Sequence, residues 1–258
     1  MTAPYAPPPD WFATAEDANP KILERIASAT DELKLPIQIK FLPRQAFWFL
    51  ANSMQLANRA NREGMHANAL SITRPCLEAI SVIELGLAQS TDANRLLGRW
   101  EAEKTSAGEL RRWLEDNVWA GYGTGLWSET WADFMGKLCK AIQPYAHYSP
   151  KLAQWQNRIV KVSGETQNGD TTLIVEYGAR SYDPQKATRI TLFHGLIYFA
   201  LARIWIAHRH TADPEFESLI ERLRIALGKS RYLDGDHTKW EEQFWAMLWF
   251  TDGNHCPE

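Results

Sequence analysis

Two oppositely charged side chains stand four residues apart in an apolar stretch of the chain. Arg74 and Glu78 belong to residues 70–87, LSITRPCLEAISVIELGL, and this spacing places them on one face of a helix, one turn apart. An arginine in this position can bind a phosphate or carboxylate group, while the carboxylate orients it or accepts a proton. The alternative is a structural role, either as a buried ion pair that fixes the helix register or as an exposed pair at a polar edge.

Pro75 lies between the two charges and affects where they point. Proline lacks a backbone donor and clashes with the preceding turn, so we expect the helix to kink or to restart there. If a new helix starts at Pro75, Arg74 lies at its entrance and can point away from Glu78.

The elements that position these residues are predominantly helical. Apolar residues recur at three-and-four spacing and are bounded by capping residues or proline, which predicts helices at residues 20–36, 43–64, 65–88, 92–117 in two pieces, 128–142, 183–210, 214–227 and 238–250. Period-two alternation is strongest at 158–177, where Asn168-Gly169-Asp170 separates two β-rich runs. The pattern predicts an all-α fold, a multi-helix bundle with a small β-hairpin insertion at residues 158–177.

Composition narrows the class of protein. The chain has 258 residues, of which 45% are hydrophobic and 12% aromatic, enough to bury a large core. A formal net charge of -3 excludes a protein that coats nucleic acid through overall positive charge. The three cysteines, Cys76, Cys139 and Cys256, are odd in number and far apart, which excludes a disulfide framework and a CxxC metal site and favours a reducing cytoplasm.

The sequence predicts one domain that follows a short N-terminal arm. Residues 1–18 are rich in proline and are predicted to form an extended N-terminal arm without the features of a secretory signal. No long linker divides residues 19–258, which are expected to form a single α-helical domain. The longest apolar run, at 190–207, is interrupted by His194 and Arg203, so we interpret it as a buried central helix and expect no membrane association.

Two segments together resemble a known type of protein. TRPCLEAISVIELGL, with WADFMGKLCKAIQPYAHYSP further on, resembles a group of uncharacterised prokaryotic helical proteins across residues 45–155. Members carry an Arg-x-x-x-Glu helix and a later helix that ends in an aromatic-x-His-small pattern. Arg74, Glu78 and His147 are the matching positions. The group is similar in outline to HEPN-type helical bundles, many of which are metal-independent ribonucleases of toxin and antiphage systems.

The resemblance draws attention to arginine–histidine spacings, because HEPN-type ribonucleases carry an Arg-x(4 to 6)-His motif. Such a pair can hold the scissile phosphate of RNA and move a proton without a metal ion. Arg59 and His66 have this spacing and straddle the polar end of a predicted helix, although Ala60 replaces the polar residue that commonly follows the arginine. Arg203 and His208 also have it, but five residues place them about 140° apart around a continuous helix.

Neither a metal nor another cofactor is expected. His208 and His210, with the distant His237 and His255, form no recognised ligand pattern with a carboxylate.

The last predicted helix, TKWEEQFWAMLWF, carries more large apolar side chains than one helix face can hold. It is therefore buried on most sides or binds a protein partner, including a second copy of the chain.

Two functions remain after these observations, and they leave open whether the protein is an enzyme. The first is a HEPN-like effector of a toxin or antiphage system, a metal-independent ribonuclease that works as a dimer and uses Arg74, Glu78, His147, Arg59 and His66. The second is a non-catalytic helical interaction or structural module whose polar centre stabilises the fold. RNA is the partner that the first function requires.

Overall fold

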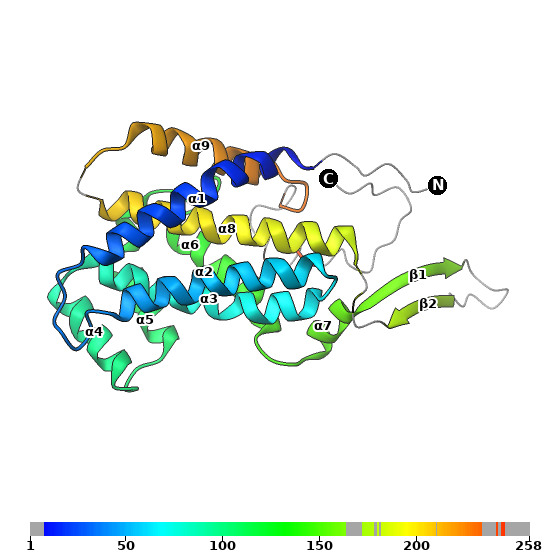
Figure 1. Cartoon of the computed structure of the whole chain (residues 1–258), viewed down its shortest axis with the longest axis horizontal. Coiled ribbons are helices and arrows are strands. Elements are labelled where there is room, and N and C mark those ends of the chain that lie inside the picture. The colour runs from blue at the N-terminus through cyan, green and yellow to red at the C-terminus, as the bar shows by residue number, and fades with distance from the viewer. Residues whose placement is uncertain are drawn as a thin grey trace.

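The computed structural model describes residues 8–163, 172–177, 180, 182–209, 211–233, 241 and 244–245. The fold is an all-α bundle with one small hairpin (Figure 1), as the sequence predicts. Its α-helices are α1 (Asp10–Asp31), α2 (Leu42–Arg62), α3 (His66–Ala88), α4 (Thr91–Glu101), α5 (Ala107–Asn117), α6 (Trp131–Ile142), α7 (Pro150–Ala153), α8 (Pro184–His208) and α9 (Pro214–Gly228). Three 3₁₀ turns, η1 (Trp119–Tyr122), η2 (Gln143–Tyr145) and η3 (Gln154–Gln156), and the strands β1 (Asn157–Ser163) and β2 (Thr172–Tyr177) connect them.

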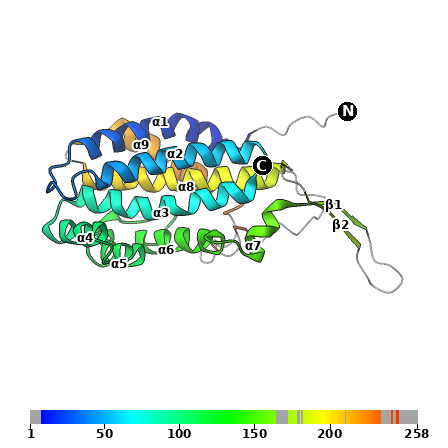
Figure 2. The same ribbon diagram turned by 60° about the horizontal axis from the view of Figure 1, so that its bottom comes forward.

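Helices α3 and α8 form the centre of the bundle. α2 lies along α3, whereas α1 and α9 pack together against α8. Figure 2 shows α4, α5 and α6 in a row along the other side of α3. Because neighbours surround α3, its residues 79–87 are all buried, and the polar side chains that it carries there must find partners inside the protein.

Helix α8 is a central helix of the bundle. It is long and apolar enough to cross a membrane by length and composition alone, but most of its apolar stretch is buried inside the protein. His194, in the middle of α8, lies 2.8 Å from Thr73 Oγ1 of α3 and 2.7 Å from Asn58 Oδ1 of α2. Burial lowers the pKa of His194 to about 3, so a neutral, hydrogen-bonded histidine joins the three helices.

The first helix begins earlier than its predicted start at Pro20. Residues 10–18, predicted to belong to the N-terminal arm, form the first turns of α1, and Trp11, Ala15 and Ala18 are buried there. Pro20 therefore lies inside α1 instead of at its start. Burial of one side of these turns stabilises the helix enough to tolerate the missing proline donor.

Pro75 does not end the helix that carries the charged pair. α3 runs without interruption from His66 to Ala88 and includes Pro75, and Arg74 remains one turn from Glu78. The predicted restart at Pro75 is therefore wrong, and the alternative of a kink stays a prediction. The packing of α3 against α2 and α8 holds the segment in a helix despite the lost hydrogen bond.

The hairpin prediction is confirmed for the described residues. β1 and β2 pair antiparallel, from Asn157 opposite Tyr177 to Ser163 opposite Thr172. The pairing shifts between Ile159 and Lys161, which marks a bulge. The predicted turn at Asn168-Gly169-Asp170 lies outside the described part of the chain.

The end of the chain is described at a few positions. The helix predicted at 238–250 lies outside the described residues apart from Glu241, Phe244 and Trp245. Phe244 and Trp245 are 0% and 7% exposed, and both rings pack on Phe193 of α8. At these two positions the aromatic side chains belong to the core. The expected docking of this helix on a partner stays a prediction.

Two glycines test how tightly the bundle is packed. A Cβ atom at Gly86 would lie 2.2 Å from Cγ of Pro43, at the start of α2, whereas one at Gly98 in α4 would meet nothing within 4 Å. We expect Gly86→Ala to lower the free energy of unfolding by about 1–3 kcal/mol through overpacking. The matched control Gly98→Ala should raise it by about 0.5–1 kcal/mol, because alanine favours a helix interior. Urea denaturation measures both changes, and equal effects would contradict this packing.

Candidate functional site

Arg74 and Glu78 meet at an open cleft and not in a dry core. Arg74 Nη1 lies 2.7 Å from Glu78 Oε1, and Arg74 Nη2 donates to Gln143 Oε1 at 3.3 Å. The side chains of Arg74 and Glu78 are 19% and 41% exposed. Water therefore reaches the pair, which lowers its contribution to stability and leaves both groups accessible to a ligand.

Four elements build this cleft, which has a volume of about 220 Å³. α3 supplies Arg74 and Glu78, η2 supplies Gln143, α6 supplies Cys139, and α5 contributes its first two residues, Ala107 and Gly108. α5 begins there because Ser106 caps it with Glu109 in a reciprocal capping box. The first backbone N–H groups of a helix lack intrahelical partners, so this end of α5 favours a negatively charged ligand.

The charged side chains of the cleft also favour an anion. Arg111 of α5 is a second guanidinium in the lining, while Glu78 is the one carboxylate among the described residues that line it. Arg74 Nε is buried and has no hydrogen-bond partner, so one donor of this guanidinium is still unused. Two guanidinium groups beside a helix start suit a single phosphate or carboxylate group.

Cys139 of α6 also lines this cleft. Burial raises the pKa of its thiol, although the neighbouring Arg111 and Arg74 act in the opposite direction. A thiol held in its neutral form is a weak nucleophile. Cys139 therefore shapes the cleft and is not a candidate for covalent chemistry.

His147 is not drawn into the cleft. It is exposed and follows Gln143 by four residues, just beyond the end of η2 at Tyr145. No hydrogen bond or ion pair joins His147 to Arg74 or Glu78 in the described structure. Of the three residues that carry the resemblance, the structure brings two together.

Arg59 and His66 occupy different environments. The side chain of Arg59 is 79% exposed and pairs with Glu63 at 3.2 Å. His66 is 1% exposed and accepts a hydrogen bond from the backbone N–H of Asp183 at its Nε2, while Nδ1 donates to Asn61 Oδ1 at 2.8 Å. Burial lowers the pKa of His66 to about 4. A neutral His66 connects the start of α3 to the start of α8, and the structure forms no Arg59–His66 site.

Arg203 and His208 both reach a third residue, Tyr122 of η1. Arg203 Nη2 donates to the backbone carbonyl of Tyr122, and His208 Nε2 lies 3.0 Å from the Tyr122 hydroxyl oxygen. The two side chains start on different sides of α8, as their spacing predicts, but α8 ends at His208 and Tyr122 lies within reach of both. Burial lowers the pKa of each residue.

Sequence reasoning missed several polar residues. Arg111 and Gln143 line the Arg74–Glu78 cleft, yet each lies in an ordinary amphipathic segment whose sequence carries no signal for the cleft. The capping box at Ser106 and Glu109 was a usable signal for a helix start. Glu84 carried another signal, because it is a carboxylate within the apolar run SVIELGL.

Comparison of the chain with protein-family models, with curated proteins and with solved structures finds no match.

The exposure of the charged pair predicts a small stability effect. We expect Glu78→Gln to lower the free energy of unfolding by less than about 1 kcal/mol, since water screens the pair. The matched control is Asp17→Asn, which breaks the exposed i,i+4 pair of Asp17 with Lys21. Urea denaturation should give similar losses for the two variants. A loss of about 3 kcal/mol or more for Glu78→Gln would mean that the pair is a buried structural device.

Proposed function

We propose that the protein is a helical effector that binds the phosphodiester backbone of RNA in the Arg74–Glu78 cleft and cleaves it without a metal ion. The observation that carries the proposal is the pairing of two guanidinium groups, from Arg74 and Arg111, with one carboxylate and the start of α5 in an open cleft. The guanidinium groups bind the non-bridging phosphate oxygens, and the carboxylate provides a base beside them.

The proposed reaction uses the 2′-hydroxyl of RNA as its nucleophile. Glu78 accepts the proton of this hydroxyl, the 2′-oxygen attacks phosphorus, and the bond from phosphorus to the 5′-oxygen breaks. The leaving 5′-oxygen takes up a proton from water, because His147 does not line the cleft. The products are a 2′,3′-cyclic phosphate and a 5′-hydroxyl end. Arg74 and Arg111 stabilise the negative charge that develops on the phosphate oxygens.

The biological setting of this proposal is a toxin or antiphage system in the cytoplasm. It rests on the similarity in outline to HEPN-type bundles and on the odd, widely spaced cysteines. The net charge of -3 implies that RNA is bound at a local cleft and not across the whole surface.

RNA cleavage by the full chain in the presence of EDTA tests this function. We expect a labelled single-stranded RNA to yield 2′,3′-cyclic phosphate ends, and Glu78→Gln to lower the rate by about 10²-fold or more, because a positioned base contributes at least that much. Arg111→Ala should weaken RNA binding. The matched control is Arg112→Ala, since Arg112 is the exposed neighbour outside the cleft. Intact RNA, with equal RNA binding by the two arginine variants, would refute the proposal.

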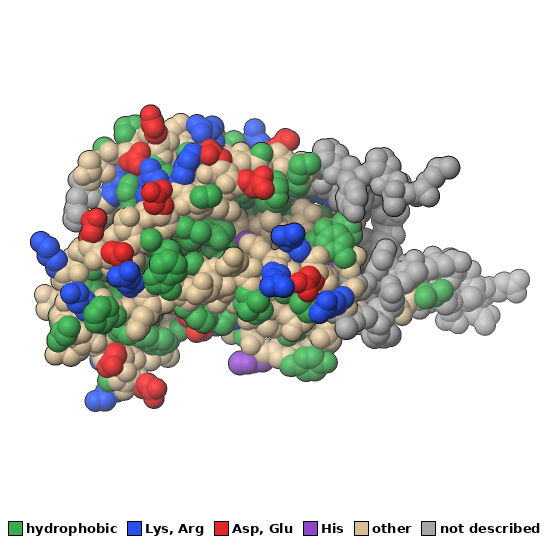
Figure 3. All heavy atoms as spheres, in the orientation of Figure 1, with side chains coloured by type: hydrophobic (Ala, Val, Ile, Leu, Met, Phe, Trp, Pro, Cys, Tyr) green, Lys and Arg blue, Asp and Glu red, His purple; other side chains and the backbone are tan. Residues whose placement is uncertain are grey.

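A second candidate function is that of an interaction module, which a specific surface favours. Phe41, Trp48, Phe49 and Leu56 are 47–55% exposed and form what we call the α2 apolar face. Figure 3 shows hydrophobic side chains gathered on the side of the molecule where α2 runs. Exposed aromatic clusters of this kind are typical of protein interfaces. We propose that the α2 apolar face pairs with a second copy of the chain.

The oligomeric state of Trp48→Glu tests this pairing. We expect the full chain to sediment as a dimer that dissociates on dilution, and Trp48→Glu to sediment as a monomer, because a charge buried at the interface is costly. Ser218→Glu, at an exposed position on α9 and away from the α2 apolar face, is the control for the added charge. Unchanged circular dichroism would show that both variants fold. A monomeric parent chain, or a dimeric Trp48→Glu variant, would exclude the interface.

A further inference from the structure

Glu84 is a carboxylate in the middle of the core. It is 0% exposed, and its Oε1 accepts hydrogen bonds from Trp119 Nε1 at 2.9 Å and from the Tyr122 hydroxyl at 2.5 Å. Its Oε2 is buried and has no partner. Such a site is costly for a negative charge, and burial raises the pKa of Glu84 to about 7. Glu84 is therefore able to gain or lose a proton near neutral pH.

Tyr122 connects Glu84 to His208, the last residue of α8. The Tyr122 ring is stacked on Trp131 with centroids 5.2 Å apart, which fixes its hydroxyl between the two titratable groups. Since Tyr122 donates its one hydroxyl proton to ionised Glu84, His208 Nε2 must carry a proton and donate it to the Tyr122 oxygen. His208 Nδ1 then keeps a lone pair. Burial lowers the pKa of His208 to about 4, so the ring is neutral.

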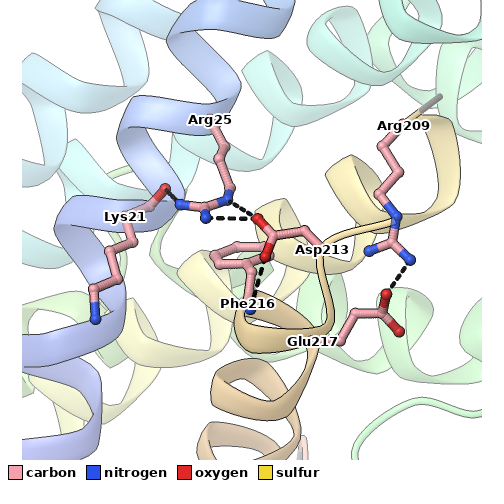
Figure 4. A network of polar contacts seen from close by, with 6 residues as sticks. All are labelled: Lys21, Arg25, Arg209, Asp213, Phe216 and Glu217. Atoms are coloured by element: carbon pink, nitrogen blue, oxygen red, sulfur yellow. Dashed lines mark hydrogen bonds and ion pairs between the residues drawn. The ribbon is translucent and has the colours of Figure 1, made fainter. Parts of the chain in front are cut away.

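His208 also lines a large cleft, which has a volume of about 1380 Å³. We call it the α1/α9 cleft, because its walls come from α1, the end of α8 and the start of α9. Two cations of its lining are held by carboxylates (Figure 4): Arg25 by Asp213 Oδ2 at 2.6 Å, and Arg209 by Glu217. Their guanidinium groups lie 5.5 and 5.7 Å from the ring of Trp205. The wall of the α1/α9 cleft thus combines a neutral base with two arginine–carboxylate ion pairs, and Glu24, Glu32 and Glu215 add further carboxylates to its lining.

We propose that Glu84, Tyr122 and His208 form the acid–base centre of the α1/α9 cleft, which takes a small molecule with a weakly acidic O–H or N–H group. The ligand gives its proton to His208 Nδ1, His208 Nε2 gives its proton to the Tyr122 oxygen, and the Tyr122 hydroxyl proton passes to Glu84. One proton moves in total, from the ligand to Glu84. The ligand becomes an anion, and the carboxylate becomes neutral.

The position of the charges favours this transfer. The negative charge leaves a dry site, where one carboxylate oxygen has no partner, and appears in an open cleft that water reaches. Water stabilises an anion there far better than the core does. The inference concerns a different cleft from the proposed RNA site and does not depend on it.

The charged side chains around Glu84, Tyr122 and His208 keep their charge near pH 7. Arg203 of α8 contacts the Tyr122 carbonyl, and Glu221 and Arg224 of α9 are its charged neighbours. The pKa of Glu221 is lowered by its hydrogen bond with Arg224, so Glu221 stays ionised above pH 5. Among these groups, Glu84 is the one whose pKa lies near 7.

Nitrogen NMR of the full chain, labelled at its histidine rings, tests the relay without a ligand. As the pH falls through about 7, Glu84 takes up a proton, Tyr122 turns its hydroxyl toward His208, and His208 should change from its Nε2–H to its Nδ1–H form without becoming charged. Glu84→Gln should keep His208 as Nε2–H at every pH, because the amide oxygen only accepts. His66 is the internal control, since the N–H of Asp183 fixes it as Nδ1–H.

A weak acid tests whether a ligand in the α1/α9 cleft gives up its proton. We use 4-nitrophenol as the probe, because its absorbance reports its ionisation. The full chain should bind it and make the bound probe about tenfold more ionised at a given pH than the free probe, a difference of one pKa unit. Tyr122→Phe and Glu84→Gln should abolish this gain, and Arg111→Ala should retain it. An unchanged His208 tautomer between pH 5 and 9, or an equal gain in Tyr122→Phe, would overturn the proposal.

Discussion

Helix α3 is enclosed by its neighbours, and the burial of its polar side chains constrains the rest of the structure. Residues 79–87 are buried without interruption, so each polar group there needs a partner from another helix or must lose its charge. Thr73 meets His194 of α8, while Glu84 meets Trp119 and Tyr122 of η1. These contacts specify which elements surround α3 and in what register.

The Arg74–Glu78 cleft and the α1/α9 cleft lie where the neighbours of α3 no longer enclose it fully. At the Arg74 end of α3, α5 begins beside the helix and leaves a small, positively charged opening. At the Glu84 end, the 3₁₀ turn η1 covers α3 but exposes a polar route through Tyr122 to His208. A charged side chain of α3 thus reaches a surface opening in both places, directly at Arg74 and through a hydrogen-bonded chain at Glu84.

Local patterns were strong enough to predict most elements. The all-α class, the hairpin at 158–177 and the central position of α8 follow from periodicity, because a helix or strand that buries one face must repeat its apolar residues at that period. The exceptions were set by packing. Pro20 and Pro75 lie inside helices, where contacts of the surrounding turns outweigh the missing donor.

For the candidate sites, too, local spacing predicted some relations between residues and helix packing decided the others. The sequence by itself determined that Arg74 and Glu78 share one helix face, because a spacing of four residues fixes this geometry wherever a helix forms. Only the tertiary structure decided that Arg111 joins them, that Arg59 and His66 separate, and that Glu84 connects to His208. Those relations join residues far apart in the chain, and their geometry depends on how whole helices pack, which no local spacing encodes.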